Sequence, residues 1–340
     1  MSEEVVIIGN SFSGLGTAIA CAKHGYQVTV IAPNNQSSFI GGLQIAPNGL
    51  AALSSLGVEQ EILNKAVRLL AVHIKAFDTA VSLTNIPLSS NNAPYVSIAR
   101  QVLYEILLSK CLTNSLVNFM DARVLAITSK NNHTRLALDT GEIITAPIII
   151  GADGWDGKTR HFVSPSARQK NSGYSIYRGI FPASKVPAGF SYPDVQLWLG
   201  NSCHLVSYPI QNSQAVNFVF AFSERAFESH SIDAIFCNHP VLSMLGEYTR
   251  NWHLTPIKQF DSLSNWRRGG ITLIGDAAHP MPPHLAQGAG QSFMDVASIE
   301  NGLSTGLTLS NVISNMITTR MPEALSVAKK SQLSGNIFRL

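Results

Sequence analysis

The chain has 340 residues, of which 45% are hydrophobic and 13% charged, and its formal net charge is +3. A chain of this length can bury a substantial core in one large or two medium domains. The small net charge, with no long run of like charges, excludes an extended basic surface for nucleic acid or anionic membranes. No apolar run reaches the roughly 18 residues that a membrane-spanning helix needs.

The four cysteines, Cys21, Cys111, Cys203 and Cys237, lie far apart in the sequence. They form no CxxC pair, so neither a disulfide framework nor a zinc site is indicated, and no metal site is expected. Free thiols in a core are typical of the reducing cytoplasm. We therefore expect a cytoplasmic protein without a secretory leader, because cleavage of a leader would remove the first strand, which begins near Glu4.

The chain opens with a strand, a glycine turn, a helix and a second strand in VVIIGNSFSGLGTAIACAKHGYQVTVIA, residues 5–32. A dinucleotide-binding turn has glycine at three places, and here these are Gly9, Ser11 and Gly14. Ser11 adds a side chain where the backbone approaches a pyrophosphate, and its hydroxyl can donate a hydrogen bond to phosphate. Ala32 stands where an acidic residue would hold the adenosine ribose. Two interpretations stay open: the segment forms a dinucleotide site, or it is a βαβ unit that contributes only to packing.

The remaining elements indicate an α/β fold. Apolar spacing predicts helices at 49–56, 59–65 and 101–110, strands at 117–120 and 148–150, and an antiparallel meander from about 124. From Gly173 to Trp266, aromatic-rich segments such as SIYRGIFPA and CHLVSYPI predict a second, mainly antiparallel sheet. The α/β pattern of the first part of the chain returns near Ile271, and helices follow from about Gln287 and over 309–332. The pattern predicts a Rossmann-like domain with a parallel sheet, interrupted by a β-rich domain, plus C-terminal helices.

The first domain is therefore expected to be discontinuous. Interleaving puts the second domain over the carboxyl ends of the first domain's strands, where ligands of open α/β sheets bind. The first domain is expected to take residues 1–75, 98–172 and 265–308, the second 76–97 and 173–264, and the helical segment 309–340.

Two further segments place polar groups after buried strands. IIIGADGWDGKTR brings Asp153 and Gly154 directly after a strand, where the carboxylate either reaches into a cleft or closes an Asx-type turn. LIGDAAHPMPPHLAQGAGQSFMD runs from a strand through Asp276 and a proline-rich turn to Gly288 at a helix start. A carboxylate at one end and helix amides at the other suit a long cofactor with hydroxyl groups and a ring that becomes anionic on reduction.

Together these motifs resemble the single-component FAD-dependent aromatic hydroxylases, the class A flavoprotein monooxygenases with the para-hydroxybenzoate hydroxylase fold. The resemblance runs from Val5 to about Phe338 and includes GGLQIAPNGLAAL at 41–53 and ARQVLYEIL with Arg100. The segments YRGIFPA, LWLGNSCHLVSYPI and NFVFAF are most similar to the salicylate and 3-hydroxybenzoate hydroxylase branch. The resemblance implies that the first domain binds FAD and the second binds substrate.

The resemblance also implies the reaction and the site. The enzyme would use FAD, NADH or NADPH, and O2 to hydroxylate a small phenolic or hydroxybenzoate-like substrate through a flavin hydroperoxide, as a monomer or homodimer. His204 and Tyr208 match positions that line the substrate pocket. The positions that match the family's FAD site are Gly9, Ser11, Gly14, Arg100, Asp153, Gly154, Asp276, Pro283, Gly288 and Ala289.

A phenol reacts better as its phenolate, so a histidine near the hydroxyl suits the task of base. His204 is the candidate, with Tyr208 on the same strand face, and a histidine that only packs in the sheet is the equal alternative. His279 is expected to make a structural hydrogen bond, whereas His284 lies either near the ring or in solvent. Four strand aromatics are expected to be core rather than pocket lining: Trp198, Phe218, Phe220 and Phe222.

Ser11, Ala32, Ala99 and Gly157 depart from the family's pattern, the first two on the ADP half of FAD. We therefore expect weak FAD retention, with purified protein partly free of cofactor. Two alternatives stay open: a flavin oxidase or reductase of the same fold that never hydroxylates, and a degenerate, non-catalytic ligand-binding relative. A flavin halogenase is not indicated, because the paired tryptophans of that group are absent.

Overall fold

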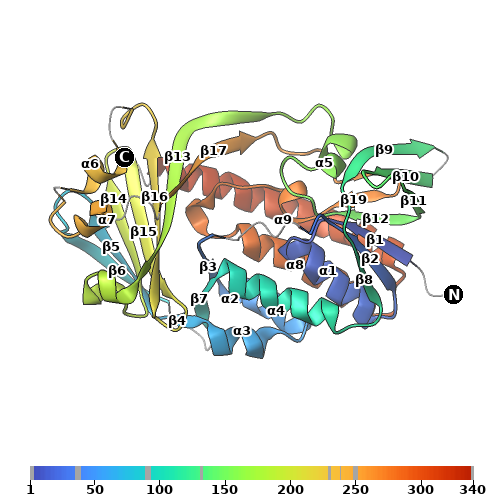
Figure 1. Cartoon of the computed structure of the whole chain (residues 1–340), viewed down its shortest axis with the longest axis horizontal. Coiled ribbons are helices and arrows are strands. Elements are labelled where there is room, and N and C mark those ends of the chain that lie inside the picture. The colour runs from blue at the N-terminus through green and yellow to red at the C-terminus, as the bar shows by residue number, and fades with distance from the viewer. Residues whose placement is uncertain are drawn as a thin grey trace.

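The computed structural model describes residues 4–34, 40–88, 93–130, 133–228, 231–237, 239–247 and 252–337. Figure 1 shows two sheets at opposite ends of the molecule with helices between them, and the long strand β13 (Gln169–Pro182) running from one part to the other. Residues 338–340 of the expected helical segment lie outside the described part.

A six-stranded sheet forms the centre of the first part, in the order β18-β19-β12-β1-β2-β8. Every neighbouring pair is parallel except β18 and β19, as expected for this domain. The apolar run at 5–8 is buried because α1 packs against β1 and β2 and other elements cover the sheet. The strands are β1 (Glu4–Ile8), β2 (Gln27–Ile31), β8 (Val117–Met120), β12 (Ile148–Gly151), β18 (Arg267–Arg268) and β19 (Ile271–Leu273).

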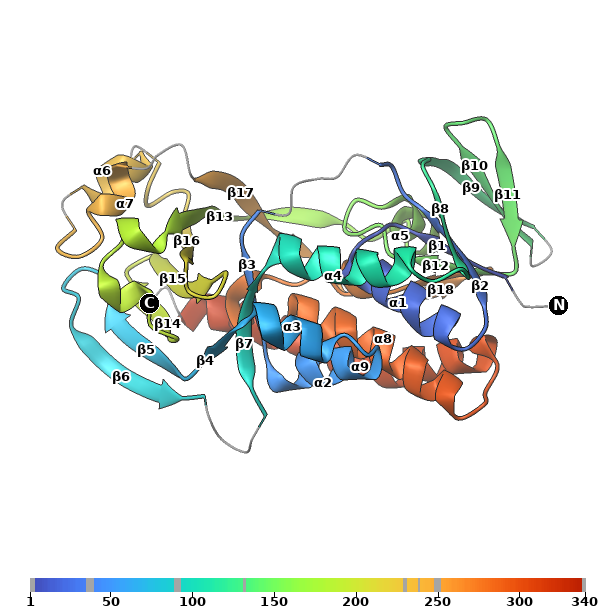
Figure 2. The same ribbon diagram turned by 60° about the horizontal axis from the view of Figure 1, so that its bottom comes forward.

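The helices pack on this sheet and on one another (Figure 2). Helix α8 contacts α1, α2 and α9, so the C-terminal helix is tied to the glycine turn through α8. The expected meander forms a separate small sheet of β9 (Val124–Lys130), β10 (His133–Leu138) and β11 (Ile143–Ala146). The helices are α1 (Phe12–Lys23), α2 (Pro47–Ser55), α3 (Glu59–Lys65), α4 (Arg100–Leu112), α5 (Lys158–Val163), α8 (Gly288–Ser304) and α9 (Leu309–Ile337).

The second part is a seven-stranded sheet in the order β17-β13-β16-β15-β14-β5-β6. It is antiparallel except between β5 and β14, which agrees with the mainly antiparallel sheet expected. Its other strands are β5 (Ala71–Ala76), β6 (Ser82–Pro87), β14 (Val195–Gly200), β15 (Cys203–Ile210), β16 (Ala215–Ser223) and β17 (His253–Phe260).

The border between the two parts differs from the expectation. Strand β5 pairs with β14, so residues 71–75 lie in the second sheet although the sequence assigned them to the first domain. Strand β7 (Tyr95–Ala99) instead joins β3 (Gly42–Ile45) and β4 (Val67–Leu69) in a small sheet. The reason is strand pairing outside the local segment, which local composition does not encode: β5 pairs with β14, more than a hundred positions away, and β7 pairs with β3 and β4.

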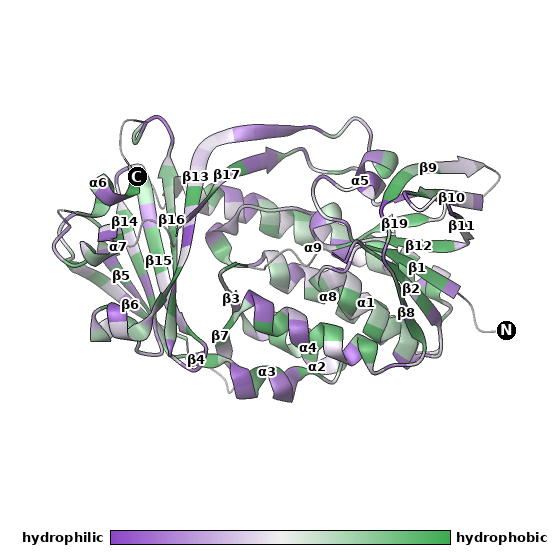
Figure 3. Ribbon diagram, viewed as in Figure 1, coloured by the Kyte–Doolittle hydropathy of each residue, from purple (hydrophilic) through white to green (hydrophobic). Residues whose placement is uncertain are grey.

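The large sheet has two different faces, because side chains alternate along a strand. One face carries a buried aromatic core that α6 (Ile232–Phe236) and α7 (Met244–Glu247) help to close, and Figure 3 shows these strands largely hydrophobic. Trp198, Phe218, Phe220 and Phe222 all belong to it, so the expectation of core is confirmed. The other face carries His204, Val206 and Tyr208 and lies against the first part, where Tyr208 reaches Gly42.

All four cysteines are free thiols, and three of them are buried. Cys21, Cys111 and Cys203 are free and buried, and burial raises the pKa of each thiol to about 12. Cys237 is free and exposed. None of the helices in the described part of the chain is long and apolar enough to cross a membrane.

Candidate active site

The turn between β1 and α1 brings helix and strand into direct contact. Gly9 has φ +103°, and a Cβ on it would lie 2.5 Å from the Ala152 carbonyl oxygen. A Cβ on Gly14 would lie 2.1 Å from the Gly9 carbonyl oxygen. Both positions therefore require glycine, Gly9 for its conformation as well as its space. The N-terminus of α1, with its partial positive charge, is held at the carboxyl end of β1.

Ser11 is the N-cap of α1. Its Oγ accepts a hydrogen bond from the Gly14 amide at 3.3 Å and donates to the Ala152 carbonyl at 2.9 Å. The hydroxyl thus connects the turn to the end of β12. A hydrogen bond from the Ser11 hydroxyl to a phosphate would compete with its bond to the Ala152 carbonyl. The Cβ of Ser11 remains at the turn in either case.

We expect Ser11→Gly to raise FAD affinity several-fold, because the change removes the side chain at the point of backbone approach. The same change should lower stability by about 1 kcal/mol through loss of the cap and its hydrogen bond. Flavin fluorescence quenching and urea unfolding measure the two effects. Ser11→Ala is the control, since it keeps the Cβ and loses the hydroxyl, and it should gain no affinity. An unchanged or weaker affinity in Ser11→Gly would contradict the explanation.

Asp153 closes a turn at the start of α5. Its Oδ2 accepts a hydrogen bond from the Thr159 amide at 3.0 Å, and its Oδ1 accepts from the Thr159 hydroxyl. Burial raises the pKa of Asp153, and the hydrogen bonds from Thr159 oppose that rise. The carboxylate therefore ties the segment after β12 to α5 through a residue six positions away, which differs from the Asx-type turn considered from the sequence, and its role toward FAD stays a prediction. A Cβ on Gly157 would lie 2.1 Å from Asp153 Oδ1, so no side chain can stand there without moving the carboxylate.

Gly157→Ala is expected to destabilise the protein by about 1–3 kcal/mol, the usual range for overpacking, and to displace Asp153 from Thr159. Gly157 has φ −63°, so the backbone itself accepts alanine and the effect is steric. Urea unfolding measures it. Gly189→Ala is a matched control, because no atom lies within 4 Å of a Cβ at that position. Equal stability of the two variants would show that Asp153 moves freely.

Asp276 follows β19 in a short 3₁₀ turn, and its side chain is exposed between the buried Gly275 and Ala277. The surrounding protein raises its pKa by desolvation, although solvent reaches the carboxylate. His279, Arg100, a hydrogen bond from Trp155, and Arg160 oppose that rise. A carboxylate that solvent reaches, with Arg100, Arg160 and His279 acting on it, suits a binding site at this strand end.

Asp295 of α8 fixes the turn that carries Asp276, a role that the sequence analysis did not find. Asp295 is fully buried, and its Oδ2 accepts from the Gly275 amide at 3.0 Å and lies 2.5 Å from His279 Nε2. Its Oδ1 accepts from Arg320 Nε of α9 at 3.1 Å. The structural hydrogen bond expected of His279 is therefore confirmed. The available signal was an acidic residue flanked on both sides by apolar residues, in FMDVA.

Arg100 and Asn217 hold the backbone where the two parts meet. Asn217 Oδ1 accepts from the Gly42 amide at 2.7 Å, and Arg100 Nε donates to the Gly42 carbonyl at 3.3 Å. Tyr208 packs against the same glycine, since a Cβ there would lie 2.8 Å from Tyr208 Cε2. Gly42 therefore lets β3 pass between α4 and the large sheet.

His204 and Tyr208 both face the first part. The His204 ring is 3% exposed and lies 5.4 Å, centroid to centroid, from the ring of the half-buried His284. His284 belongs to the 3₁₀ turn Pro283–Leu285, which ends just before Gly288 and Ala289 at the start of α8. His284 therefore packs beside His204 rather than standing free in solvent, and its nearness to the flavin ring stays a prediction.

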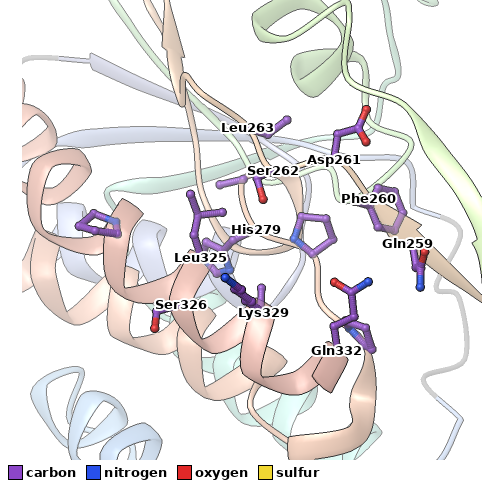
Figure 4. Close-up of a pocket in the computed structure, with 15 residues that line it drawn as sticks. Gln259, Phe260, Asp261, Ser262, Leu263, His279, Leu325, Ser326, Lys329 and Gln332 are labelled. Atoms are coloured by element: carbon purple, nitrogen blue, oxygen red, sulfur yellow. The ribbon is translucent and has the colours of Figure 1, made fainter. Parts of the chain in front are cut away.

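A cavity of about 410 Å³ lies between α9, the end of β17 and the segment 278–282 that follows Asp276. Figure 4 shows Leu325 and Lys329 of α9 on one side of it and Asp261 and Phe260 on the other, with His279 between them. Neither Asp276 nor His204 lines it. We therefore do not assign this cavity to the substrate.

Comparison with known proteins identifies the family. The FAD binding domain family matches residues 2–326. The chain belongs to this family. Its curated relatives include 3-hydroxybenzoate 6-hydroxylase 1 of Aquipseudomonas alcaligenes, 27% identical over 320 residues covering 88% of this chain and 80% of that one. Another is 3-amino-4-hydroxybenzoate 2-monooxygenase PtmB3 of Streptomyces platensis, 29% identical over 358 residues covering 99% and 88%.

Solved structures of FAD-binding proteins share the fold. Klebsiella pneumoniae HpxO complexed with FAD and uric acid has a TM-score of 0.86 at 17% identity and covers 99% of this chain and 89% of its own. A salicylate hydroxylase substrate complex has a TM-score of 0.82 at 18% identity, with the same coverage. The resemblance to FAD-dependent aromatic hydroxylases inferred from the motifs is confirmed, and FAD is the cofactor.

The residues of this FAD-binding protein fit the cofactor. Two cations, Arg100 and Arg160, act on Asp276 at the strand ends, and the N-terminus of α1 lies nearby. Arg160 is 4% exposed, and its Nη1 and Nη2 have no hydrogen-bond partner among the described residues. Buried guanidinium groups of this kind need anionic acceptors, which a pyrophosphate supplies.

Proposed function

We propose that the protein is an FAD-dependent monooxygenase that uses NADH or NADPH to hydroxylate a small phenolic or hydroxybenzoate-like substrate. Membership of the FAD-binding family and curated relatives that are named hydroxybenzoate hydroxylases support the reaction class. The observation that carries the assignment is the position of His204 on the sheet face toward the first part, with His284 of the cofactor-side turn beside it.

FAD, when bound, would accept the reducing equivalents of NADH or NADPH and supply the activation of oxygen. We assign its phosphates to Gly9, Ser11, Gly14 and Arg100, its ribityl region to Asp276, and its ring to Pro283, Gly288 and Ala289. Asp153 and Gly154 shape the neighbouring turn. The protein's contribution is to hold the ring and substrate together and to keep water out, and the buried face of the large sheet suits that task.

His204 is assigned as the base for the substrate phenol. The phenolic O–H bond breaks, its proton passes to a ring nitrogen of His204, and the oxygen keeps the electron pair as phenolate, which makes the ring more nucleophilic. Tyr208 lies four residues further along the same strand and on the same face. Its pKa is raised by burial, with Arg100 and Arg178 opposing the rise, so its hydroxyl stays protonated and is available as a donor.

The visible absorption spectrum before and after adding FAD, followed by NADH and NADPH oxidation with a panel of hydroxybenzoates and hydroxynicotinates, tests this function. Bound flavin with oxidation stimulated by one or more of the aromatic compounds is the expected result. Stoichiometric hydrogen peroxide without product across the panel would favour the oxidase or reductase alternative. Absence of retained flavin at saturating FAD would favour the non-catalytic alternative.

We also propose a cellular location and an oligomeric state, and the choice between NADH and NADPH stays open. A cytoplasmic location is consistent with the free, buried thiols of Cys21, Cys111 and Cys203. A monomer or a homodimer is expected, and size-exclusion chromatography with light scattering measures which one forms. The comparison of NADH with NADPH in the same oxidation assay decides the nicotinamide cofactor.

A further inference from the structure

The second strand of the first sheet ends without the acidic residue that a dinucleotide site usually has there. Strand β2 ends at Ile31, and Ala32 takes the position from which a carboxylate would hold the adenosine ribose. Between Glu4 and Glu59 the sequence contains no aspartate or glutamate. No residue of this segment can therefore supply a carboxylate to a ribose bound beside the turn at Gly9.

Asp121 brings a carboxylate to the same place from the neighbouring strand. Strands β2 and β8 are parallel neighbours with Ile31 opposite Met120, and Asp121 follows β8 directly. The Ala32 amide donates to the Met120 carbonyl at 3.1 Å, so the pairing continues past the end of β2. Adjacent strands are about 4.8 Å apart, so the backbone at Asp121 is about that far from the backbone at Ala32.

A hydrogen bond directs the Asp121 side chain toward the end of β2. Its Oδ1 accepts from the amide of Asn34, two residues after Ala32, at 2.7 Å. Asp121 is exposed, and no residue in the described part of the chain donates to its Oδ2. One oxygen therefore fixes the orientation of the carboxylate, and the other is free to accept from the hydroxyl of a ligand.

The position of Asp121 in the sheet also distinguishes it from the other carboxylates at this edge. The sheet order is β19-β12-β1-β2-β8, so Asp276 after β19 and Asp153 after β12 lie on the other side of β1. The Gly9 amide donates to the Ile31 carbonyl at 2.9 Å, which joins the first turn to the end of β2. A ribose that follows phosphates held at the first turn reaches the end of β2, where Asp121 is the carboxylate at hand.

We propose that Asp121 binds the ribose hydroxyls in the adenosine half of FAD, in place of the acidic residue absent at Ala32. The proposal rests on FAD as the cofactor and on the assignment of its phosphates to the first turn, and it holds whichever reaction the flavin carries out. The adenine amino group is another hydrogen-bond donor in the same half of FAD. The bond from Asn34 favours the ribose, because it holds the carboxylate at the end of β2.

The test is a titration of the flavin-free, full-length protein with FAD, followed by quenching of flavin fluorescence. The variants are Asp121→Ala and Asp121→Asn. ADP, 2′-deoxy-ADP and IDP then compete with FAD, since the second lacks one ribose hydroxyl and the third lacks the adenine amino group. Asp233→Asn is the control, because it neutralises an exposed carboxylate on α6 in the second part of the molecule.

Asp121→Ala should weaken FAD binding by about tenfold, the usual value of a hydrogen bond to a charged group. Wild type should bind ADP more tightly than 2′-deoxy-ADP, whereas Asp121→Ala should bind the two equally and keep the wild-type ratio of ADP to IDP. Asp121→Asn should fall between, because its amide oxygen still accepts from Asn34 and from a hydroxyl. Asp233→Asn should match wild type.

Three results would overturn the assignment. These are an FAD affinity that Asp121→Ala leaves unchanged, a ratio of ADP to 2′-deoxy-ADP that is the same in wild type and Asp121→Ala, and a change in the ratio of ADP to IDP instead, which would place Asp121 at the adenine. Because no turnover is measured, failure of the proposed hydroxylation is recognised separately. In that case FAD and ADP bind through Asp121 but no product forms in the oxidation assay.

Discussion

Asp295→Ala is expected to destabilise the protein by about 3–5 kcal/mol, the range for breaking a buried ion pair by removal of one partner. The carboxylate is fully buried and serves Arg320, His279 and the Gly275 amide. Its removal leaves a guanidinium that is 4% exposed and whose one remaining carboxylate partner in the described part of the chain is Glu323, at the surface. Urea unfolding at saturating FAD measures the change. FAD affinity should also fall, because Gly275 and His279 flank Asp276.

Glu323→Ala is the matched control, since it removes the other partner of Arg320. That carboxylate is 61% exposed, so its loss should cost about 1 kcal/mol or less. If Asp295→Ala and Glu323→Ala lowered the free energy of unfolding equally little, Asp295 would not be the group that holds α9 to the turn at Gly275.

The effect of Asp295 should depend on pH in one direction. Burial raises the pKa of Asp295, but His279, Arg320 and the Gly275 amide outweigh it, so the pKa lies below its ordinary value. A depressed carboxyl pKa contributes stability that is complete above the unfolded value, near 4, and is lost as the pH falls through the folded value. The stability difference between wild type and Asp295→Ala should therefore be full at pH 7 and shrink below about pH 4.

His204→Gln is expected to lower the rate of hydroxylation by about a hundredfold to ten-thousandfold, the contribution of a positioned base. Glutamine has a similar size and can fill the site, but it cannot take the phenol proton. Reduction of the flavin by NADH or NADPH should change little, because that step does not need the base. Product formation and stopped-flow flavin reduction measure the two rates on the same preparation.

His133→Gln is the control, because His133 is exposed on the small sheet of β9, β10 and β11. It should leave both rates as in wild type. An equal loss of hydroxylation and flavin reduction in His204→Gln would point to a folding defect, and full hydroxylation in that variant would remove His204 from the role of base.

The sequence predicts the parts of the site that short segments determine. The glycines of the first turn, Asp276 after β19 and the paired orientation of His204 and Tyr208 all follow from local pattern and strand alternation. Helix α3 over 59–65 and strand β8 over 117–120 also lie where the apolar spacing predicts them. These features depend on residues within one element or one turn.

The rest depends on contacts between residues far apart in the chain. The Ser11 hydroxyl donates to Ala152, 141 positions away, and Asn217 accepts from Gly42, 175 positions away. The local sequence around Arg178 predicts only a strand, because the register that places Arg178 opposite Val219 is set by pairing between β13 and β16. Asp153 shows the same limit. Its local sequence suits both a turn and a ligand-binding carboxylate, and its contact with Thr159 at the start of α5 depends on how the chain folds.

Hydroxylation under isotopically labelled O2 tests the assignment as a monooxygenase most directly. FAD-loaded enzyme is given NADH or NADPH and the hydroxybenzoate that stimulates oxidation best, and the product is examined by mass spectrometry. One labelled oxygen atom in a newly formed ring hydroxyl is the predicted result. Oxidation of the nicotinamide with all labelled oxygen recovered as hydrogen peroxide, for every aromatic acid in the panel, would contradict it.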